Sequence, residues 1–267
     1  MSAELRERDL GELIGLCFQL AAEQFGRLFL LQLLIVVPAL AVQLWLQPEL
    51  RPEQVQGLTV EQATPLLLDF VAEFLLVLLV QAVFAPLAAA AAPVLVADCF
   101  HGRPPSLPRA LREGVRRYPG MLLFMLTLGV LQGLGVCTLY VASVLFTVWF
   151  FVAGPALVLE RTSWVDAFAR SRDLTAGHRL EVLGLFLVTW VGPALLIGGA
   201  AGFVELVVPS YWARAILAQL LGLVIGIVPL AAPTVVYYHL RVLKEAYDVE
   251  RLAELVDRIG EAPPPPG

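Results

Sequence analysis

Charged residues are scarce in this chain. Asp, Glu, Lys and Arg make up 15% of its 267 residues, against about a quarter in soluble domains. Apolar residues make up 59%, more than the surface of a water-soluble domain of this length accommodates. The shortage of charge therefore excludes an ordinary soluble protein and indicates an integral membrane protein, whose outer surface faces lipid.

Cysteine is also rare, and the usual motifs of catalytic and metal sites are missing from the sequence. Its three cysteines are too few and too scattered for a disulfide framework or a Cys-x-x-Cys metal site. The three histidines have no partner at metal-binding spacing, and no nucleophile elbow or glycine-rich phosphate loop occurs. We therefore expect no metal, no cofactor and no catalysis, and a net charge of −5 gives no reason to expect nucleic acid as a partner.

Long apolar runs are what the sequence does have. A helix of about 20 apolar residues crosses a bilayer, and six candidate spans occur at about 27–47, 66–97, 120–140, 142–160, 181–204 and 214–239. The third and fourth adjoin without an intervening charge, so we predict a tight turn near residues 140–143. The predicted fold is an all-α polytopic bundle in one domain, residues 1–260, followed by a disordered Pro-rich tail, 261–267.

Basic residues fall almost entirely on one side of this topology. All but Arg51 and Arg214 lie in the two terminal segments or in the connections 98–119 and 160–180, which share a side. Because positively charged loops stay in the cytoplasm, we predict that both termini are cytoplasmic and that the protein lies in a bacterial inner (plasma) membrane. The mixed charges before the first span also predict that no signal peptide is cleaved.

Three amphipathic segments precede the odd-numbered spans. They begin at Asp9, Ser106 and Ser163, residue types that cap helix N-termini. Apolar residues follow at i, i+3 and i+4 in each segment, and the same helix face continues at i+7 and i+8. We therefore predict three cytoplasmic cap helices in the interface plane, so that the chain consists of three units of cap helix plus hairpin. Arg172 occupies the last offset of the third unit, and its head reaches either water or an acceptor such as Glu160 or a lipid phosphate.

The C-terminal segment 241–259 predicts a further helix outside the membrane. Opposite charges recur there at i,i+4, and an apolar stripe runs along one face. A fully solvated helix does not need such a stripe. We therefore expect this helix to pack on the protein itself or on a protein partner.

Small residues and prolines mark several places within the spans. Three Gly-x-x-x-Gly pairs, Gly129/Gly133, Gly198/Gly202 and Gly222/Gly226, allow close helix approach and predict internal packing, with homodimerisation as the alternative. We expect broken helices at Gly192-Pro193 and at Pro229 and Pro233, since prolines interrupt spans that line cavities.

Clustered arginines are the candidate binding residues. They attract anionic phospholipid headgroups and set orientation, or they frame a phosphate pocket, because Arg binds phosphate through two parallel hydrogen bonds. The candidate headgroup or phosphate contacts are Arg112, Arg116, Arg117, Arg170, Arg172 and Arg241.

The chain resembles a known family in two stretches, PALVLERTSWVDAFARSRDLTAGHRLEVLGL (155–185) and VVYYHLRVLKEAYDVERL (235–252). Both are similar to the six-span bacterial proteins of the glycerophosphoryl diester phosphodiesterase membrane-domain family. The matching positions are Pro155, Glu160, Ala167, Arg170, Ser171, Leu174, Gly177, Tyr237, Tyr238, Leu240, Arg241, Lys244 and Glu245, whereas His239 and Ala246 stand where Asp and Gly are common. The resemblance implies six spans. It implies no phosphodiesterase activity, because the catalytic barrel of the family's fused members does not fit in this chain.

Two functions follow as hypotheses. The apolar stripe and the missing catalytic motifs favour a non-enzymatic scaffold or accessory subunit that acts at the cytoplasmic membrane face. The alternative is a carrier or binding protein for a lipid or small anionic solute, with an arginine-lined cytoplasmic site between kinked spans. An intramembrane hydrolase is the least favoured, because no nucleophile–base pair is evident.

Overall fold

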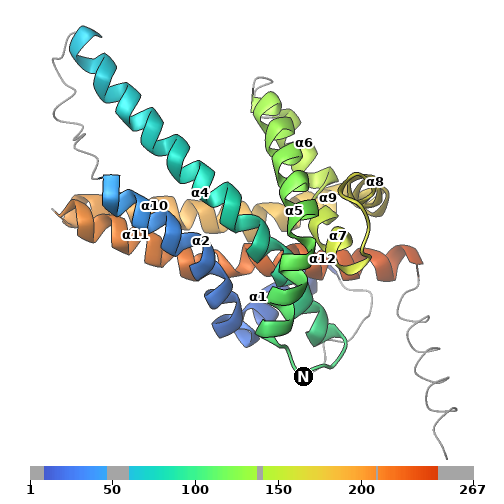
Figure 1. The fold of residues 1–267 in the computed structure, drawn as a ribbon. Helices are drawn as coiled ribbons and strands as arrows, with labels where there is room; N and C mark the ends of the chain where they lie inside the picture. Colours follow the sequence, from blue (N-terminus) through green and yellow to red (C-terminus); the bar gives the residue numbers. More distant parts are fainter. Residues whose placement is uncertain (1–8, 47–59, 137–140, 209, 246–267) are drawn as a thin grey trace, which may run out of the picture.

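The computed structural model describes residues 9–46, 60–136, 141–208 and 210–245, and these form helices without strands (Figure 1). The helices are α1 (Leu10–Glu23), α2 (Phe25–Leu46), α4 (Val60–Phe100), α5 (Leu107–Val136), α6 (Val141–Trp149), α7 (Ala153–Leu159), α8 (Trp164–Thr175), α9 (Arg179–Phe186), the π-helix η1 (Leu187–Val191), α10 (Gly192–Val207), α11 (Tyr211–Ile225) and α12 (Ile227–Glu245). Six helical stretches are long and apolar enough to cross a membrane, which confirms the predicted all-α multi-pass bundle.

The ends of two predicted segments lie outside the described residues. The predicted turn near residues 140–143 falls partly on 137–140, but α6 already begins at Val141, so Ser143 belongs to a helix and not to the turn. The predicted helix 241–259 is described only as far as Glu245, where α12 ends, and the tail 261–267 is not described.

The fourth span differs from the prediction of one helix over 142–160. It is divided into α6 and α7 at residues 150–152. Pro155 has no N–H for the carbonyl of Phe151, and its ring would clash with that group in a continuous helix. The carbonyl of Trp149 instead accepts hydrogen bonds from Ser171 Oγ at 2.9 Å and Thr175 Oγ1 at 3.5 Å. The break therefore anchors α8 on this span.

The interruptions predicted in the fifth and sixth spans are found only in part, since α12 continues without a break through Pro233 and the fifth span changes to a π-helix without ending. The π-helix η1 ends where Gly192-Pro193 begins α10. In the sixth span α11 stops at Ile225 and α12 starts at Ile227, since Pro229 cannot donate to the carbonyl of Ile225. Gln32 Nε2 of α2 donates to the carbonyl of Gly226 at 2.7 Å, and a Cβ at Gly226 would lie 2.6 Å from that nitrogen.

Two of the three predicted cap helices are separate elements. Asp9 caps α1 by accepting from the Glu12 N–H at 2.7 Å, and Ser163 caps α8 by accepting from the Asp166 N–H at 3.2 Å. The second cap segment, in contrast, is not a separate helix, because α5 continues through Pro119 into the third span. Contacts with α4 support α5 on both sides of this point: Gly114 lies against the backbone of α4, and the Tyr118 hydroxyl donates to the Val83 carbonyl at 2.8 Å.

The three cap segments bury equivalent positions. The residues at offsets i+3 and i+7 are buried in every unit: Leu13 and Cys17, Ala110 and Gly114, Ala167 and Ser171. The residues at offset i+8 are exposed in every unit: Phe18, Val115 and Arg172. The packed face is therefore narrower than the sequence pattern predicts, and it is repeated in all three units.

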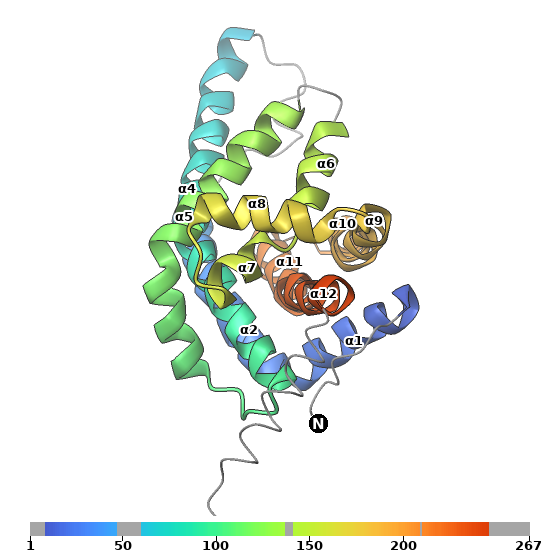
Figure 2. The same cartoon turned by 90° about the vertical axis from the view of Figure 1, so that its right-hand side faces the viewer.

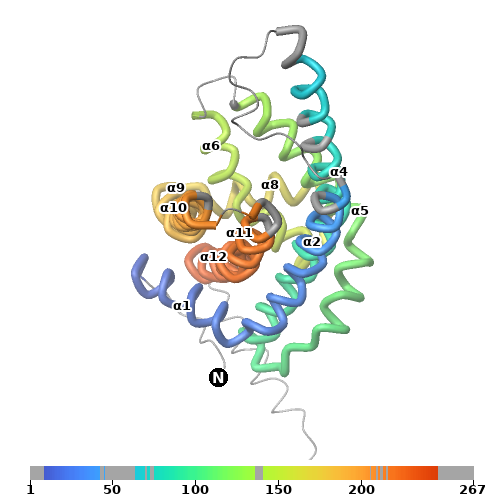
Figure 3. The backbone as a smooth tube through the Cα atoms, turned by 90° about the vertical axis from the view of Figure 1, so that its left-hand side faces the viewer, coloured from blue at the N-terminus to red at the C-terminus, as the bar shows by residue number. Residues whose placement is uncertain are grey.

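Most fully buried side chains lie at one end of the bundle. They concentrate in the second half of α4, in α7 and in α12. Figure 2 looks nearly along α12, which lies among α1, α7, α8 and α9. Figure 3 shows α2, α4 and α5 side by side, on the side of the bundle away from α1 and α9. The first half of α4 and the α5–α6 hairpin extend away from this packed end (Figure 1), with large apolar side chains exposed as a lipid-facing surface requires.

Most of the Gly-x-x-x-Gly residues do not serve the predicted internal packing. Among the described residues, and apart from the backbone of its own helix, a Cβ at Gly129, Gly133, Gly198, Gly202 or Gly222 would meet nothing within 4 Å. Only Gly226 is at a close approach. Gly135, outside these pairs, is also at a close approach, since a Cβ there would lie 2.6 Å from the backbone nitrogen of Ser143. Spacing alone does not determine which face of a helix meets its neighbour.

Candidate functional site

Two helices of the packed end finish with the same short pattern. In α4 an acid follows a proline by five residues, Pro93 and Asp98, and at the end of α7 the same spacing gives Pro155 and Glu160. Each acid pairs with an arginine from the following cap segment: Asp98 Oδ1 with Arg109 NH1 at 3.0 Å, and Glu160 Oε1 with Arg170 Nε at 2.9 Å. In α12 the residue five after Pro233 is Tyr238. Comparing the three units could have found this spacing, which the sequence analysis missed.

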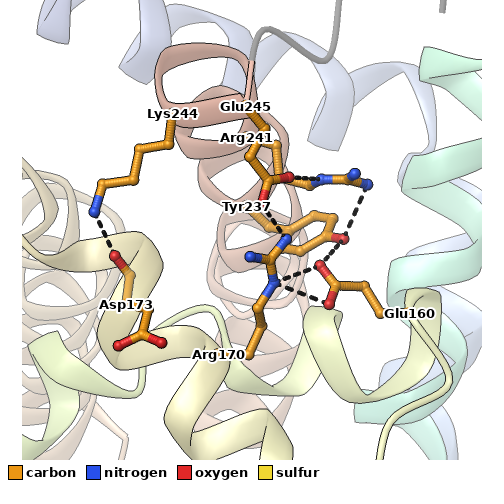
Figure 4. A network of polar contacts seen from close by, with 7 residues as sticks. All are labelled: Glu160, Arg170, Asp173, Tyr237, Arg241, Lys244 and Glu245. Carbon is orange, nitrogen blue, oxygen red and sulfur yellow. Dashed lines mark hydrogen bonds and ion pairs between the residues drawn. The ribbon is translucent and has the colours of Figure 1, made fainter. Parts of the chain in front are cut away.

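Glu160 is the centre of a polar network that joins α7, α8 and α12 (Figure 4). Both its carboxylate oxygens lie 2.9 Å from Arg170 Nε. Oε1 also accepts a hydrogen bond of 2.8 Å from the hydroxyl of Tyr237, a residue that is 1% exposed. One carboxylate thus satisfies a buried tyrosine and an arginine at the junction of three elements.

Glu245 extends the network along α12. Its two oxygens lie 2.5 Å from Arg170 NH2 and 2.8 Å from Arg241 Nε. The Arg241 guanidinium also lies over the Tyr237 ring, 5.7 Å from its centroid. Burial lowers the pKa of Arg170, but the hydrogen bonds and charges of Glu160 and Glu245 outweigh it and raise that pKa above its ordinary value. Arg170 therefore stays charged, and Glu245 joins it to Arg241.

A pocket of about 210 Å³ lies where α4, the start of α5, α7 and α12 meet. Its polar lining residues are Asp98, His101, Arg103, Arg109, Glu113, Arg161, Tyr237, Tyr238 and Arg241. Four arginines against two acids leave a formal excess of two positive charges. The pocket is smaller than the roughly 300–1,000 Å³ of sites for drug-sized ligands, so it suits a group the size of a lipid headgroup.

Arg161 reaches this pocket from an unfavourable backbone conformation. It follows α7 with φ = 57°, the left-handed region, which costs about 1–2 kcal/mol for a residue other than glycine. The other described residues with positive φ are glycines, Gly102 and Gly177. Glycine is the usual residue at such helix ends, so an arginine at this position points to a use for its side chain.

Histidines form a second cluster, away from the pocket. Glu181 of α9 contacts His239 Nε2 of α12 at 2.9 Å and His178 Nδ1 at 3.3 Å. His239 is 4% exposed, so this contact joins α9 and α12 in the protein interior. Within the described ranges no group of three or more His, Cys, Asp or Glu side chains is arranged to hold a metal ion.

The structure brings together only two of the six arginines predicted as ligand contacts. Arg170 and Arg241 share Glu245, and Arg241 alone of the six lines the pocket. The others lie apart from it: Arg112, Arg116, Arg117 and Arg172. Arg172 does not reach Glu160, which Arg170 holds, and its side chain is exposed instead. Contact of these four with headgroups stays a prediction.

The remaining pocket arginines had other roles in the sequence analysis. Arg103, Arg109 and Arg161 are not among the six arginines predicted as ligand contacts, and Arg103 and Arg161 counted only toward orientation. Their convergence depends on the contacts of α4, α7 and α12, which neither charge nor spacing reveals.

Comparison of the chain with models of protein families, with curated proteins and with solved structures finds no match. The resemblance to the glycerophosphoryl diester phosphodiesterase membrane-domain family therefore stays a prediction.

Proposed function

We propose that this multi-pass membrane protein is a binding protein that holds an anionic, phosphate-bearing headgroup or small solute in the arginine-lined pocket. The observation that carries the proposal is the convergence of Arg103, Arg109, Arg161 and Arg241 around one small cavity. Guanidinium groups match phosphate oxygens in geometry and charge. Partial burial strengthens such contacts relative to water.

The place of the pocket along the spans supports a headgroup as the ligand. Asp98 and Tyr237 lie near the ends of apolar spans, and the pocket opens among the arginines that follow them. Phospholipid phosphates lie at this level of a bilayer. The lining offers arginine, acid, histidine and tyrosine side chains, and we propose binding without catalysis. The scaffold hypothesis rests on segment 241–259, which is described only as far as Glu245, and stays a prediction.

The proposed location is a bacterial inner membrane with the arginine-rich side in the cytoplasm. This placement rests on the positive-inside rule and on the family resemblance. The pocket then faces the inner leaflet, where anionic lipids attract basic side chains by about 1 kcal/mol per charge.

Alkaline-phosphatase fusions test this orientation. The enzyme is active only outside the cytoplasm, so we expect inactive fusions at residues 110 and 170 and an active one near residue 55. Fusions to a cytoplasmic reporter at the same sites should give the opposite pattern. Activity of the phosphatase at residue 110 or 170 would contradict the proposed orientation.

Reversing the charge of one pocket arginine tests the proposed binding. The full chain, released from nanodiscs of phosphatidylethanolamine and phosphatidylglycerol, is expected to retain a stoichiometric phospholipid in native mass spectrometry. Arg103→Glu should lower this retention about tenfold, because one charged hydrogen bond is worth roughly 1.5–3 kcal/mol. Arg103 is exposed, and its side chain forms no ion pair with a described residue, so this change should leave the fold intact.

Arg112→Glu is the matched control. Arg112 is also exposed, lies in the same connection and changes charge by the same amount, but it does not line the pocket. Retention by this variant should equal that of the unchanged protein. An equal loss in both variants would mean diffuse attraction between lipid and basic surface, and the proposed pocket function would be wrong.

A further inference from the structure

Asp98 is the least expected residue in an arginine-lined pocket. Its side chain is 4% exposed, and it lines the cavity together with four arginines. Oδ1 accepts a hydrogen bond from Arg109 NH1 at 3.0 Å. Oδ2 is buried and accepts no hydrogen bond within the described part of the chain. A buried carboxylate oxygen without a donor is costly, so this atom requires an explanation.

The hydrogen bond from Arg109 accounts for only one of the two carboxylate oxygens of Asp98. An acid that positions an arginine does so best through two parallel hydrogen bonds, but Asp98 uses one oxygen, and Arg109 is half exposed. Glu160 is the corresponding acid of the next unit. Both its oxygens accept from Arg170, and Oε1 also accepts from Tyr237. Of these two corresponding acids, the one that lines the cavity, Asp98, has the unpaired oxygen.

The lining is also dipolar and not uniformly basic. Asp98 and Glu113 contribute two negative charges beside the positive charges of Arg103, Arg109, Arg161 and Arg241. A ligand with a phosphate alone would contact the arginines but leave Asp98 Oδ2 without a donor. A ligand with both a phosphate and a cationic N–H donor would satisfy both parts of the lining.

On the basis of the proposed function, we infer that the pocket recognises a zwitterionic aminophosphate of the phosphoethanolamine type. The arginines bind the phosphate, and Asp98 accepts a hydrogen bond from the primary ammonium. An ammonium group carries three donors, and its charge compensates the buried carboxylate. A trimethylammonium group has no N–H for Oδ2, and the glycerol of phosphatidylglycerol has no positive charge. Selectivity for a primary amine therefore distinguishes this site from a general anion site.

Competition between short-chain phospholipids tests this inference. The full chain is equilibrated with equal amounts of dihexanoyl phosphatidylethanolamine and phosphatidylglycerol, and the bound fractions are measured by native mass spectrometry. We expect a preference of about tenfold for phosphatidylethanolamine, the worth of one charge-assisted hydrogen bond. Asp98→Asn should abolish the preference, because the amide is neutral, while the dependence of binding on Arg103 remains.

A second series leaves the protein unchanged. Successive N-methylation of the ligand, from phosphatidylethanolamine to phosphatidylcholine, keeps the charge and removes the donors, and binding should decline along this series. This ligand series tests the inferred ammonium contact even if Asp98→Asn fails to fold. Free phosphorylethanolamine, compared with inorganic phosphate as a competitor, identifies the source: displacement of the lipid by free phosphorylethanolamine alone supports a soluble ligand, and displacement by neither supports a membrane lipid.

The outcomes separate the two proposals. Equal binding of all headgroups, with retention still dependent on Arg103, would overturn the aminophosphate inference and leave the phosphate pocket standing. Binding that depends on neither Arg103 nor Asp98 would overturn both. A preference for phosphatidylglycerol would show that Oδ2 takes a hydroxyl donor, and the inference of an ammonium group would be wrong.

Discussion

Replacement of Arg161 by glycine is expected to weaken phospholipid retention about tenfold and to leave the protein as stable as before, or more stable. The loss of binding follows from the removal of one guanidinium from the pocket, at roughly 1.5–3 kcal/mol for a charged hydrogen bond. The gain in stability follows from the backbone. At φ = 57° glycine avoids the steric cost of about 1–2 kcal/mol that arginine pays. Native mass spectrometry measures the first effect and thermal unfolding in detergent the second.

Arg161→Ala is the matched variant for this experiment. Alanine removes the same guanidinium but keeps a Cβ in the left-handed region. Both variants should therefore lose binding equally, while alanine should be about 1 kcal/mol less stable than glycine. Equal stability of the two would mean that residue 161 relaxes out of this conformation. Full retention of lipid in both would show that the Arg161 guanidinium does not take part in binding.

The spans could be predicted from the sequence because lipid solvation is a property of local composition. About 20 apolar residues suffice wherever the helices pack, and α2 follows the predicted span 27–47 closely. The N-caps of α1 and α8 could be predicted equally well, since an N-cap depends on Asp9 or Ser163 and the next three residues. The continuity of α5 was not, because it depends on support from α4 through contacts such as Tyr118 to Val83.

The pocket was less predictable for a related reason. Helix breaks follow prolines, but the residue that stabilises a break is distant in sequence, as Gln32 is for Gly226. Charge counts group the arginines on one side of the predicted topology, which stays a prediction. They could not separate Arg103 and Arg161, which line the cavity, from Arg112, which does not. Which arginines line the cavity depends on the left-handed backbone conformation of Arg161 and on three helix ends that meet only in the folded chain.

Removal of Glu160 is expected to destabilise the junction of α7, α8 and α12 by about 2–3 kcal/mol, an estimate based on one stranded buried hydroxyl and one weakened ion pair. In Glu160→Ala the hydroxyl proton of Tyr237, 1% exposed, loses its acceptor at 2.8 Å, while Arg241 NH1 still donates to the hydroxyl oxygen at 3.4 Å. The ion-pair contribution is smaller, since Arg170 and Glu160 are 28% and 20% exposed and Arg170 keeps Glu245. Reversible unfolding of the purified protein in mixed micelles measures the difference in free energy.

Three comparisons assign this loss to the buried tyrosine. Glu160→Gln keeps an oxygen for the Tyr237 hydroxyl and should lose only about 1 kcal/mol. Glu113→Ala removes an exposed pair with Arg116 at 3.4 Å and should cost less than about 0.5 kcal/mol. Tyr237→Phe added to Glu160→Ala should restore part of the stability, because no buried hydroxyl proton is then left without an acceptor.

The double variant decides between two descriptions of the network. If Tyr237→Phe restores stability to Glu160→Ala, the carboxylate acts mainly by satisfying a buried hydroxyl, and the arginines around it are held by the remaining acids. If the double variant is no more stable than Glu160→Ala, the ion pair with Arg170 carries the energy despite its exposure. Arg241 would then depend on Glu160 through Arg170 and Glu245, and the network would be part of what keeps the pocket in shape.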